Sequence, residues 1–249
     1  MNPRIVGCIA VSHVFKINAD VLFSAESHWM KAIRVWDLPT RIFHWALALA
    51  VIGLVITGNV GGNAMVWHFR LGYCVGSLII FRIVWGFVGG FWSRWQQFSL
   101  SPMRLKEHVF SKSSQTNYLG HNPTGSLSVL VILLFLSVQV GSGFISDDEI
   151  ANAGPLTHLV SEKTIQWATY WHTEIGKAIV LVLVLIHVLA IAWYFYRKKI
   201  NLVRPMLTGD KTSTQDATSS NDRPLDWLKA LVVLGLSAYV IYRLVNLNL

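Results

Sequence analysis

Residues 171–196, WHTEIGKAIVLVLVLIHVLAIAWYFY, combine two histidines with one long apolar run. Such a run is long enough to cross about 30 Å of hydrocarbon at about 1.5 Å per residue, and it predicts a transmembrane helix over residues 175–196. In an α-helix the 15 residues from His172 to His187 correspond to about 22 Å along the axis and a turn of about 60°. Because an imidazole in lipid is costly without a partner, both positions indicate function.

Four further apolar runs predict helices over residues 42–60, 67–91, 127–145 and 225–247. The chain is 53% hydrophobic and 14% charged, with a mean hydropathy of +0.47, which is typical of a polytopic membrane protein. We therefore expect an all-α membrane protein with a four-helix transmembrane bundle and a fifth, C-terminal transmembrane helix. The alternative for the fifth run, which contains Lys229 and Arg243, is a helix lying in the membrane interface.

Basic residues indicate the orientation, because those in short loops stay on the cytoplasmic side. They precede the first helix, separate the second from the third and follow the fourth: Lys31, Arg34, Arg41, Arg94, Arg104, Lys106, Lys112, Arg197, Lys198, Lys199 and Arg204. The stretch 146–174 is acidic. The first helix is thus expected to start on the cytoplasmic side. The net charge of +8 then reflects topology, and no basic patch with groove-reading elements indicates nucleic-acid binding.

Four segments are expected along the chain. Residues 1–29 form a doubtful leader. Their apolar run is short for a signal peptide and no clear cleavage site follows it, so we expect the native chain to start at Met30. Residues 30–207 form the helical core. Residues 208–224 are polar and predict a flexible linker, and residues 225–249 form the fifth helix.

Four histidines fall at two matched depths in the predicted helices. His44 and His187 lie toward the cytoplasmic side, and His68 and His172 toward the opposite side. They form two candidate pairs of axial ligands for haem or another metal. Two imidazoles on one haem iron leave no open position, so the expected chemistry is one-electron transfer. No C-x-x-C-H motif is present, so any haem is held without covalent attachment.

Small and basic residues near these histidines are candidate cofactor contacts. Gly72 and Gly176 each follow a histidine by four residues and remove a side chain from its face, although close helix packing is the alternative. Arg41 lies three residues before His44 and could pair with a propionate. Arg82 returns to within about 40° of the His68 face, with snorkelling to the headgroups as its alternative.

Several blocks together resemble the bacterial cytochrome b561 family, which includes the cytochrome b subunits of nickel-iron hydrogenases. They are RIFHW with its downstream TG, H-x-x-x-G-Y followed by FRIVWGFVGG, YLGHNPTG, and WHTEIG followed by IHVLAIAWY and NLVRPMLTGDK, between residues 30 and 211. The resemblance implies a haem-binding four-helix core in the bacterial inner membrane and two non-covalent b-type haems. It implies axial ligands at His44, His68, His172 and His187.

Three functions follow from this pattern. The first is a respiratory electron carrier, at most a quinol-linked oxidoreductase subunit, which passes electrons between the quinone pool and a periplasmic cytochrome or redox enzyme. The second is the membrane anchor cytochrome b subunit of a hydrogenase or formate dehydrogenase. The third, a metal transporter, would need carboxylates at the histidine depths, and the helices have none there. A quinone, if bound, is expected near Arg41 and Arg82, and His121 is read as structural or as part of a quinone or partner surface.

Overall fold

The structure, a computed structural model, describes residues 31–103, 105–106, 119–149, 151–214 and 216–247. The expected leader, the start at Met30, Arg104 and Lys112 lie outside the described residues. The chain divides into two compact units, residues 1–32 with 212–216 and residues 33–211 with 217–249. In the described part of the first unit, Lys31 Nζ and Asp216 Oδ1 form an exposed ion pair at 2.7 Å. All described helices belong to the second unit.

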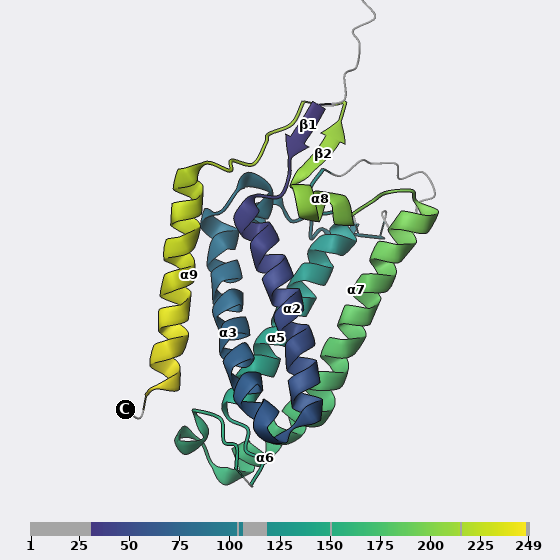
Figure 1. Cartoon of the computed structure of the whole chain (residues 1–249). Coiled ribbons are helices and arrows are strands. Elements are labelled where there is room, and N and C mark those ends of the chain that lie inside the picture. Colours follow the sequence, from purple (N-terminus) through teal and green to yellow (C-terminus); the bar gives the residue numbers. More distant parts are fainter. Residues whose placement is uncertain (1–30, 104, 107–118, 150, 215, 248–249) are drawn as a thin grey trace, which may run out of the picture. The chain divides into compact units, whose positions relative to one another are not determined.

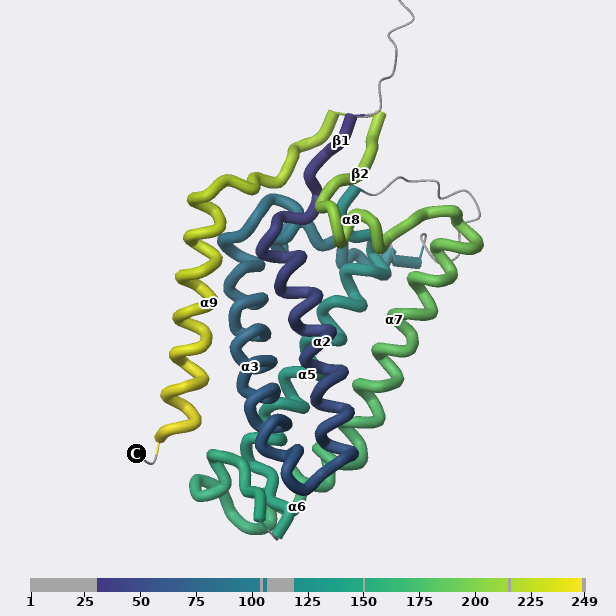
Figure 2. The backbone as a smooth tube through the Cα atoms, in the orientation of Figure 1, coloured from purple at the N-terminus to yellow at the C-terminus, as the bar shows by residue number. Residues whose placement is uncertain are grey.

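Five helices are long and apolar enough to cross a membrane, which confirms the predicted fold class. They are α2 (Leu38–Val60), α3 (Met65–Val88), α5 (Pro123–Phe144), the continuous helix formed by α6 (Glu162–Tyr170), η5 (Trp171–Gly176) and α7 (Lys177–Arg197), and α9 (Pro224–Val245) (Figure 1). The chain runs alternately up and down through them (Figure 2). The shorter elements are β1 (Lys31–Arg34), which pairs with β2 (Asp210–Ser213), α8 (Val203–Thr208), and the 3-10 turns η1 (Gly62–Ala64), η2 (Phe91–Ser93), η3 (Trp95–Gln97) and η4 (Thr157–Leu159).

Helices α2 and α5 begin at the same end of the bundle, which we call the α8 end, and both have a side-chain cap there. The Asp37 carboxylate accepts from the N–H of Thr40 at 2.8 Å, and the Asn122 side chain accepts from the N–H of Gly125 at 2.6 Å. A proline follows each cap within the first turn, where its missing N–H costs no hydrogen bond. These caps explain why both helices start a few residues before their predicted apolar runs.

The apolar contacts of the bundle centre on α3. One cluster joins α2, α3, α5 and α9 through Phe43, Leu78, Phe81, Trp85, Leu133 and Ala230. A second joins α2, α3, α5 and α7 through Ala50, Val75, Ile79, Leu136 and Val180. Helix α9 packs along α3 over much of its length, as Figure 1 shows, so the fifth run is a bundle helix and not an interfacial one.

The helix containing His172 differs from its prediction in length and winding. It begins at Glu162, well before the expected residue 175, behind the N-cap of Ser161. Its η5 segment is a π-helix, so the uniform α-helix on which the expected angle of about 60° between His172 and His187 was based does not extend over residues 171–176. We call the end of the bundle that contains α6 the α6 end.

Within the expected linker of residues 208–224, Ser220 and Asp222 form hydrogen bonds with the residues before α2 and at its start. Ser220 donates through its N–H to Arg34 O at 2.7 Å and through its hydroxyl to Val35 O at 3.0 Å. Asp222 accepts from the N–H of Leu38 at 3.1 Å and forms an ion pair with Arg34. Burial alone would raise the pKa of Asp222, but hydrogen bonds from Trp227, Leu38 and Arg34 together lower it. This segment therefore attaches α9 firmly to the start of α2.

Candidate functional site

The structure brings the four histidines together as two pairs, at the two ends of the bundle. The ring centroids of His44 on α2 and His187 on α7 are 6.3 Å apart, with an interplanar angle of 48°. Those of His68 on α3 and His172 in η5 are 6.0 Å apart, with an interplanar angle of 89°. The His44–His187 pair lies toward the α8 end and the His68–His172 pair toward the α6 end. Both pairings expected from depth are present as close ring pairs.

The spacing within each pair fits a shared metal ion. An imidazole nitrogen binds a first-row metal at about 2 Å, so two imidazoles on opposite sides of one ion have centroids roughly 6 Å apart. Both measured separations are close to this value. Among the described residues, no three His, Cys, Asp or Glu side chains are grouped so that they could hold a metal ion by themselves. Each pair thus offers two axial donors to a group that brings its other ligands, as haem does.

Helix α2 positions the ring of His68. The Nδ1–H of His68 donates to the carbonyl oxygen of Leu54 at 3.1 Å, and the Thr57 hydroxyl lies 3.3 Å from the same nitrogen. A Cβ placed on Gly58 would be 3.1 Å from Cε1 of the ring. With Nδ1 bonded to α2, the other ring nitrogen, Nε2, keeps its lone pair for a metal.

Helix α5 holds His172 through contacts of the same kind. Its Nδ1–H donates to the carbonyl oxygen of Gln139 at 2.9 Å, and the Ser142 hydroxyl lies 3.3 Å from Nδ1. A Cβ on Gly143 would be 2.7 Å from Cε1 of the ring. The Gln139 side chain also donates to the backbone oxygen of His172 at 2.8 Å, within the π-helical segment. π-Helical turns often occur at functional sites, and this one was not predicted from the sequence.

The His44–His187 pair lacks such hydrogen bonds. Nδ1 of His44 is buried without a hydrogen-bond partner among the described residues, and none of those residues forms a hydrogen bond with the His187 ring either. The nearest aromatic neighbour of His44 is Trp45, in an edge contact at 5.1 Å. The environments of the two pairs therefore differ although their spacings agree.

Arg41, a predicted propionate partner, contacts protein groups at the α8 end. It donates to the carbonyl oxygen of Leu207 at 2.6 Å and lies 3.6 Å from the Asp222 carboxylate. Its Nε is buried and has no partner in the described part of the chain. The guanidinium thus joins α2 to α8 and to the segment before α9, with one donor left over.

Arg82 points into the protein and not to the membrane surface, so the snorkelling alternative is wrong. Its side chain is only 2% exposed, and its guanidinium lies over the ring of Trp95 at 4.2 Å. Nη1 has no partner among the described residues. The Asp37 carboxylate supplies a compensating charge, and it accepts from Gly90 N–H at 2.9 Å and from the Ser93 hydroxyl at 2.9 Å. Asp37 was not predicted as a site residue, although the capping pattern D-x-P marks its position.

His121, which the sequence left as structural or part of a binding surface, lies among aromatic rings near Arg82. Its ring centroid is 4.6 Å from that of Trp36 and 4.7 Å from that of Phe98. Burial lowers the pKa of His121, and the positive charges of Arg82 and Lys211 lower it further. The imidazole is therefore neutral at pH 7, in contact with a cationic region.

The predicted glycines have different surroundings. A Cβ on Gly72 would have no neighbour within 4 Å, so its face is open. A Cβ on Gly176 would meet the Gln139 side chain at 2.0 Å and Trp171 at 2.7 Å, which is a helix-packing contact. Gly58 and Gly143 do lie against the histidines, but the sequence analysis did not identify them. Their only signal in the sequence is the threonine or serine that directly precedes each glycine.

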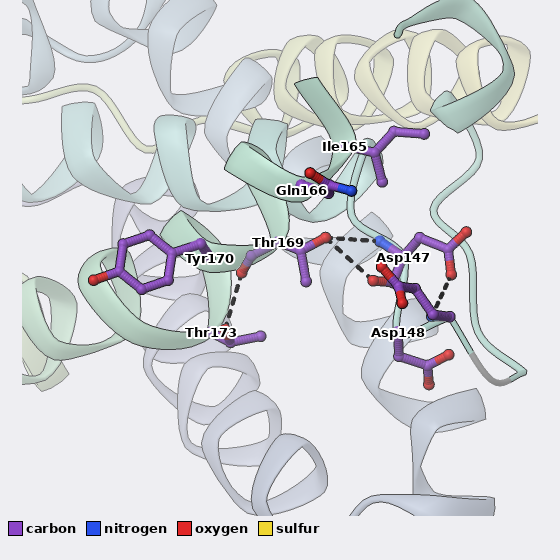
Figure 3. A pocket seen from close by; sticks show the side chains of 8 residues that line it. Asp147, Asp148, Ile165, Gln166, Thr169, Tyr170 and Thr173 are labelled. Carbon is purple, nitrogen blue, oxygen red and sulfur yellow. Dashed lines mark hydrogen bonds between the residues drawn. The ribbon is translucent and has the colours of Figure 1, made fainter. Parts of the chain in front are cut away.

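An open acidic pocket lies at the α6 end, beside η5. Its lining combines Asp147, Asp148 and Glu149 with residues of α6 and η5. Figure 3 shows Asp147 beside Thr169 of α6. Asp147 and Thr169 are joined twice, with the Asp147 N–H donating to the Thr169 hydroxyl at 3.0 Å and that hydroxyl 3.2 Å from Asp147 O. The Thr173 hydroxyl donates to Thr169 O at 2.9 Å. The acidic surface is thereby attached to the helical turn that carries His172.

A family model described as prokaryotic cytochrome b561 matches residues 35–209. The matched range contains all four paired histidines, whereas α9 lies outside it. No solved structure matches the chain.

Several curated proteins are similar to this chain. One from Cupriavidus necator, named "Probable Ni/Fe-hydrogenase B-type cytochrome subunit", is 25% identical over 76% of this chain and 90% of its own length. One with the same name from Rhodobacter capsulatus is 24% identical over 74% of this chain and 83% of its own length. A third from Azotobacter vinelandii is 28% identical, but the match covers 46% of this chain and only 57% of that protein.

Proposed function

Because the chain belongs to the prokaryotic cytochrome b561 family, we propose that it carries two non-covalent b haems, one on each histidine pair. Family membership and the five spanning helices make it a multi-pass membrane cytochrome b that transfers electrons. The observation that carries the proposal is the matched spacing of 6.3 Å and 6.0 Å between ring centroids in two pairs on different helices.

Haem held by two imidazoles supplies one-electron transfer. The residues of this chain orient the ligands and set their surroundings. Backbone carbonyls of α2 and α5 hold Nδ1–H of His68 and His172, and Arg41 and Arg82 supply positive charge at the α8 end. The unpartnered Nη1 of Arg82 and Nε of Arg41 are buried donors suited to an acidic group such as a propionate.

The orientation proposed for the chain places the α8 end on the cytoplasmic side of the bacterial inner membrane. Arg94, Lys198, Lys199 and Arg204 lie in connections at this end, whereas the connection at the α6 end carries Asp147, Asp148 and Glu149. Basic connections remain cytoplasmic during insertion. The His68–His172 pair then lies near the periplasmic side.

We propose two partners, a membrane quinone near Arg82 and a redox enzyme on the periplasmic side. The names of the relatives favour a hydrogenase-type subunit over a soluble cytochrome as the redox partner. This is the anchor function among the alternatives. Hydrogen-dependent haem reduction in membranes of the source organism would support it, whereas reduction by another donor alone would favour the general electron conduit.

A haem count tests the proposal. The full chain, purified in detergent, should contain two acid-acetone-extractable haems per protein and should titrate as two one-electron components in its optical spectrum. One haem or none would contradict the assignment of both pairs. A quinol-oxidation assay in proteoliposomes, with Arg82→Gln as the variant, tests the quinone part separately, and an unchanged rate would reject the site near Arg82.

A further inference from the structure

Two five-residue segments on different helices contact the α6-end histidines in the same way. Residues 54–58, LVITG, lie on α2, and residues 139–143, QVGSG, lie on α5. In each segment the carbonyl oxygen of the first residue accepts from an imidazole Nδ1, at 3.1 Å for His68 and 2.9 Å for His172. The hydroxyl of the fourth residue lies 3.3 Å from the same nitrogen in both.

The fifth residue of each segment is a glycine for a steric reason. Residues four apart lie on the same helix face, so a side chain at the fifth position would stand beside the carbonyl of the first. A Cβ would be 3.1 Å from Cε1 of His68 at Gly58 and 2.7 Å from Cε1 of His172 at Gly143. Glycine therefore lets the ring approach the helix closely enough to reach its carbonyl.

We propose that the 54–58 and 139–143 segments are two matched positioning devices, which orient the His68 and His172 rings and lower the reduction potential of the haem they bind. This inference rests on the proposed haem at the His68–His172 pair. The positioning residues are Thr57 with Gly58 on α2 and Ser142 with Gly143 on α5. They act through the histidines that they contact.

The effect on the potential follows from the hydrogen bonds. An imidazole that donates its Nδ1–H to an oxygen is a more basic ligand at its other nitrogen, and a more basic ligand stabilises oxidised iron. The two segments also hold the rings at an interplanar angle of 89°, against 48° for the His44–His187 pair. The electron paramagnetic resonance spectrum of low-spin ferric haem depends on the angle between its axial rings, so the two haems should give separate signals.

Two kinds of variant test the devices. Thr57→Val replaces the hydroxyl by a methyl group and Ser142→Ala removes it. Because each hydroxyl lies near Nδ1 and also donates to the carbonyl that accepts Nδ1–H, each variant should shift the midpoint potential of one haem while the other haem stays unchanged. Gly58→Ala and Gly143→Ala push the ring away from the carbonyl, and each should shift both the potential and the paramagnetic resonance signal of that same haem. If a glycine variant does not accumulate, the hydroxyl variants decide alone.

Gly141→Ala is the matched control. Gly141 lies on α5 between Ser142 and Val140, but a Cβ there has no neighbour within 4 Å, and two residues along a helix from Gly143 the side chain faces the opposite side. Both potentials and both signals should equal those of the parent. The proposal is overturned if the hydroxyl and glycine variants retain haem and also match the parent.

His68→Ala separates haem binding from the positioning role. If His68→Ala retains both haems, the pair does not bind haem and the proposed function fails. If His68→Ala loses one haem while Thr57→Val and Ser142→Ala keep the parental potentials, only the positioning role fails.

Discussion

The rings of the His68–His172 pair both donate to carbonyl oxygens of a neighbouring helix, whereas those of the His44–His187 pair have no hydrogen-bond partner among the described residues. At the α8 end, buried charges occupy the surroundings instead, with Arg82 over Trp95 and Asp37 held by several donors. Hydrogen bonds to an axial ligand and nearby charges are separate means of tuning a haem. One bundle thus provides two different environments for the same kind of histidine pair.

The largest expected effect comes from removing a ligand. His172→Ala should lose one haem, because an iron held by a single imidazole is poorly retained, and His68→Ala should lose the same one. The double variant should lose no more than either single variant, since paired residues are not additive. Haem extraction and the paramagnetic resonance spectrum measure which haem remains.

His158→Ala, outside both pairs, is the control for these variants and should keep both haems. Loss of both haems from His172→Ala, in a chain that still folds, would show that the pairs are not independent.

A large stability effect is expected from Asp37→Ala at the α8 end. The carboxylate accepts from the N–H groups of Thr40 and Gly90 and from the Ser93 hydroxyl, so its loss removes a helix cap and leaves buried donors without an acceptor. A cap is worth about 1 kcal/mol and each buried unsatisfied group about 1–3 kcal/mol, so a loss of about 3 kcal/mol or more is expected. Unfolding in detergent, followed by circular dichroism, measures it.

The matched control is Asp226→Ala, in the first turn of α9. Its partners Arg223 and Lys229 are exposed, at 3.3 Å and 3.7 Å, so the cost should be about 1 kcal/mol or less. Asp37→Ala should also release the His44–His187 haem before the other. Release of the His68–His172 haem first would contradict the division of the bundle into two environments.

A moderate loss of stability at acidic pH is expected because of His121. Burial and the positive charges of Arg82 and Lys211 lower the pKa of His121 to about 3 in the folded protein. In the unfolded chain this imidazole binds a proton near pH 6.5, whereas in the folded protein it does so only near pH 3. The unfolded state thus binds more protons in this range, and stability falls as the pH falls from about 6.5 toward about 3. His121→Gln should lose less stability than the parent over the same range, as melting temperatures measured at several pH values would show. An identical pH dependence in the two proteins would exclude His121 as the cause.

The smallest effect is expected from Gly76→Ala on α3. A Cβ there would be 3.1 Å from Cδ1 of Ile241 on α9, the flexible end of a side chain that moves easily. The free energy of unfolding should fall by about 1 kcal/mol or less, which a slightly lower melting temperature would show, and neither haem potential should change. A shifted potential would instead mean that this glycine faces a haem.

The membrane spans and the two ring pairs were predictable from the sequence, because long apolar runs and histidines within them are direct consequences of the lipid environment. The hydrogen-bond acceptors of His68 and His172 were not, since every helical residue has a carbonyl and nothing marks the one of Leu54 or Gln139. Gly176 follows His172 at the expected spacing, yet the structure packs it against Gln139. Spacing along one helix does not specify which neighbour covers a given face.

The inward direction of Arg82 was left open for a related reason. Whether a guanidinium turns to lipid headgroups or to the protein depends on residues elsewhere in the chain, here Asp37, which lies far before Arg82 in the sequence, and Trp95, which follows it. The polar composition of residues 208–224 predicts a linker but does not reveal individual hydrogen bonds, such as that of Ser220 to Val35.

The π-helical turn at residues 171–176 has a consequence for the long helix that carries both His172 and His187. Its wider winding changes the azimuth of everything on one side of the turn relative to the other. Residues on the two sides of the turn therefore face directions that a uniform α-helix would not give them. His172, within the turn, contacts α5, whereas His187, beyond it, pairs with His44 on α2. Deleting a single residue from the turn would rotate one imidazole away from its partner without altering the composition of α6 or α7.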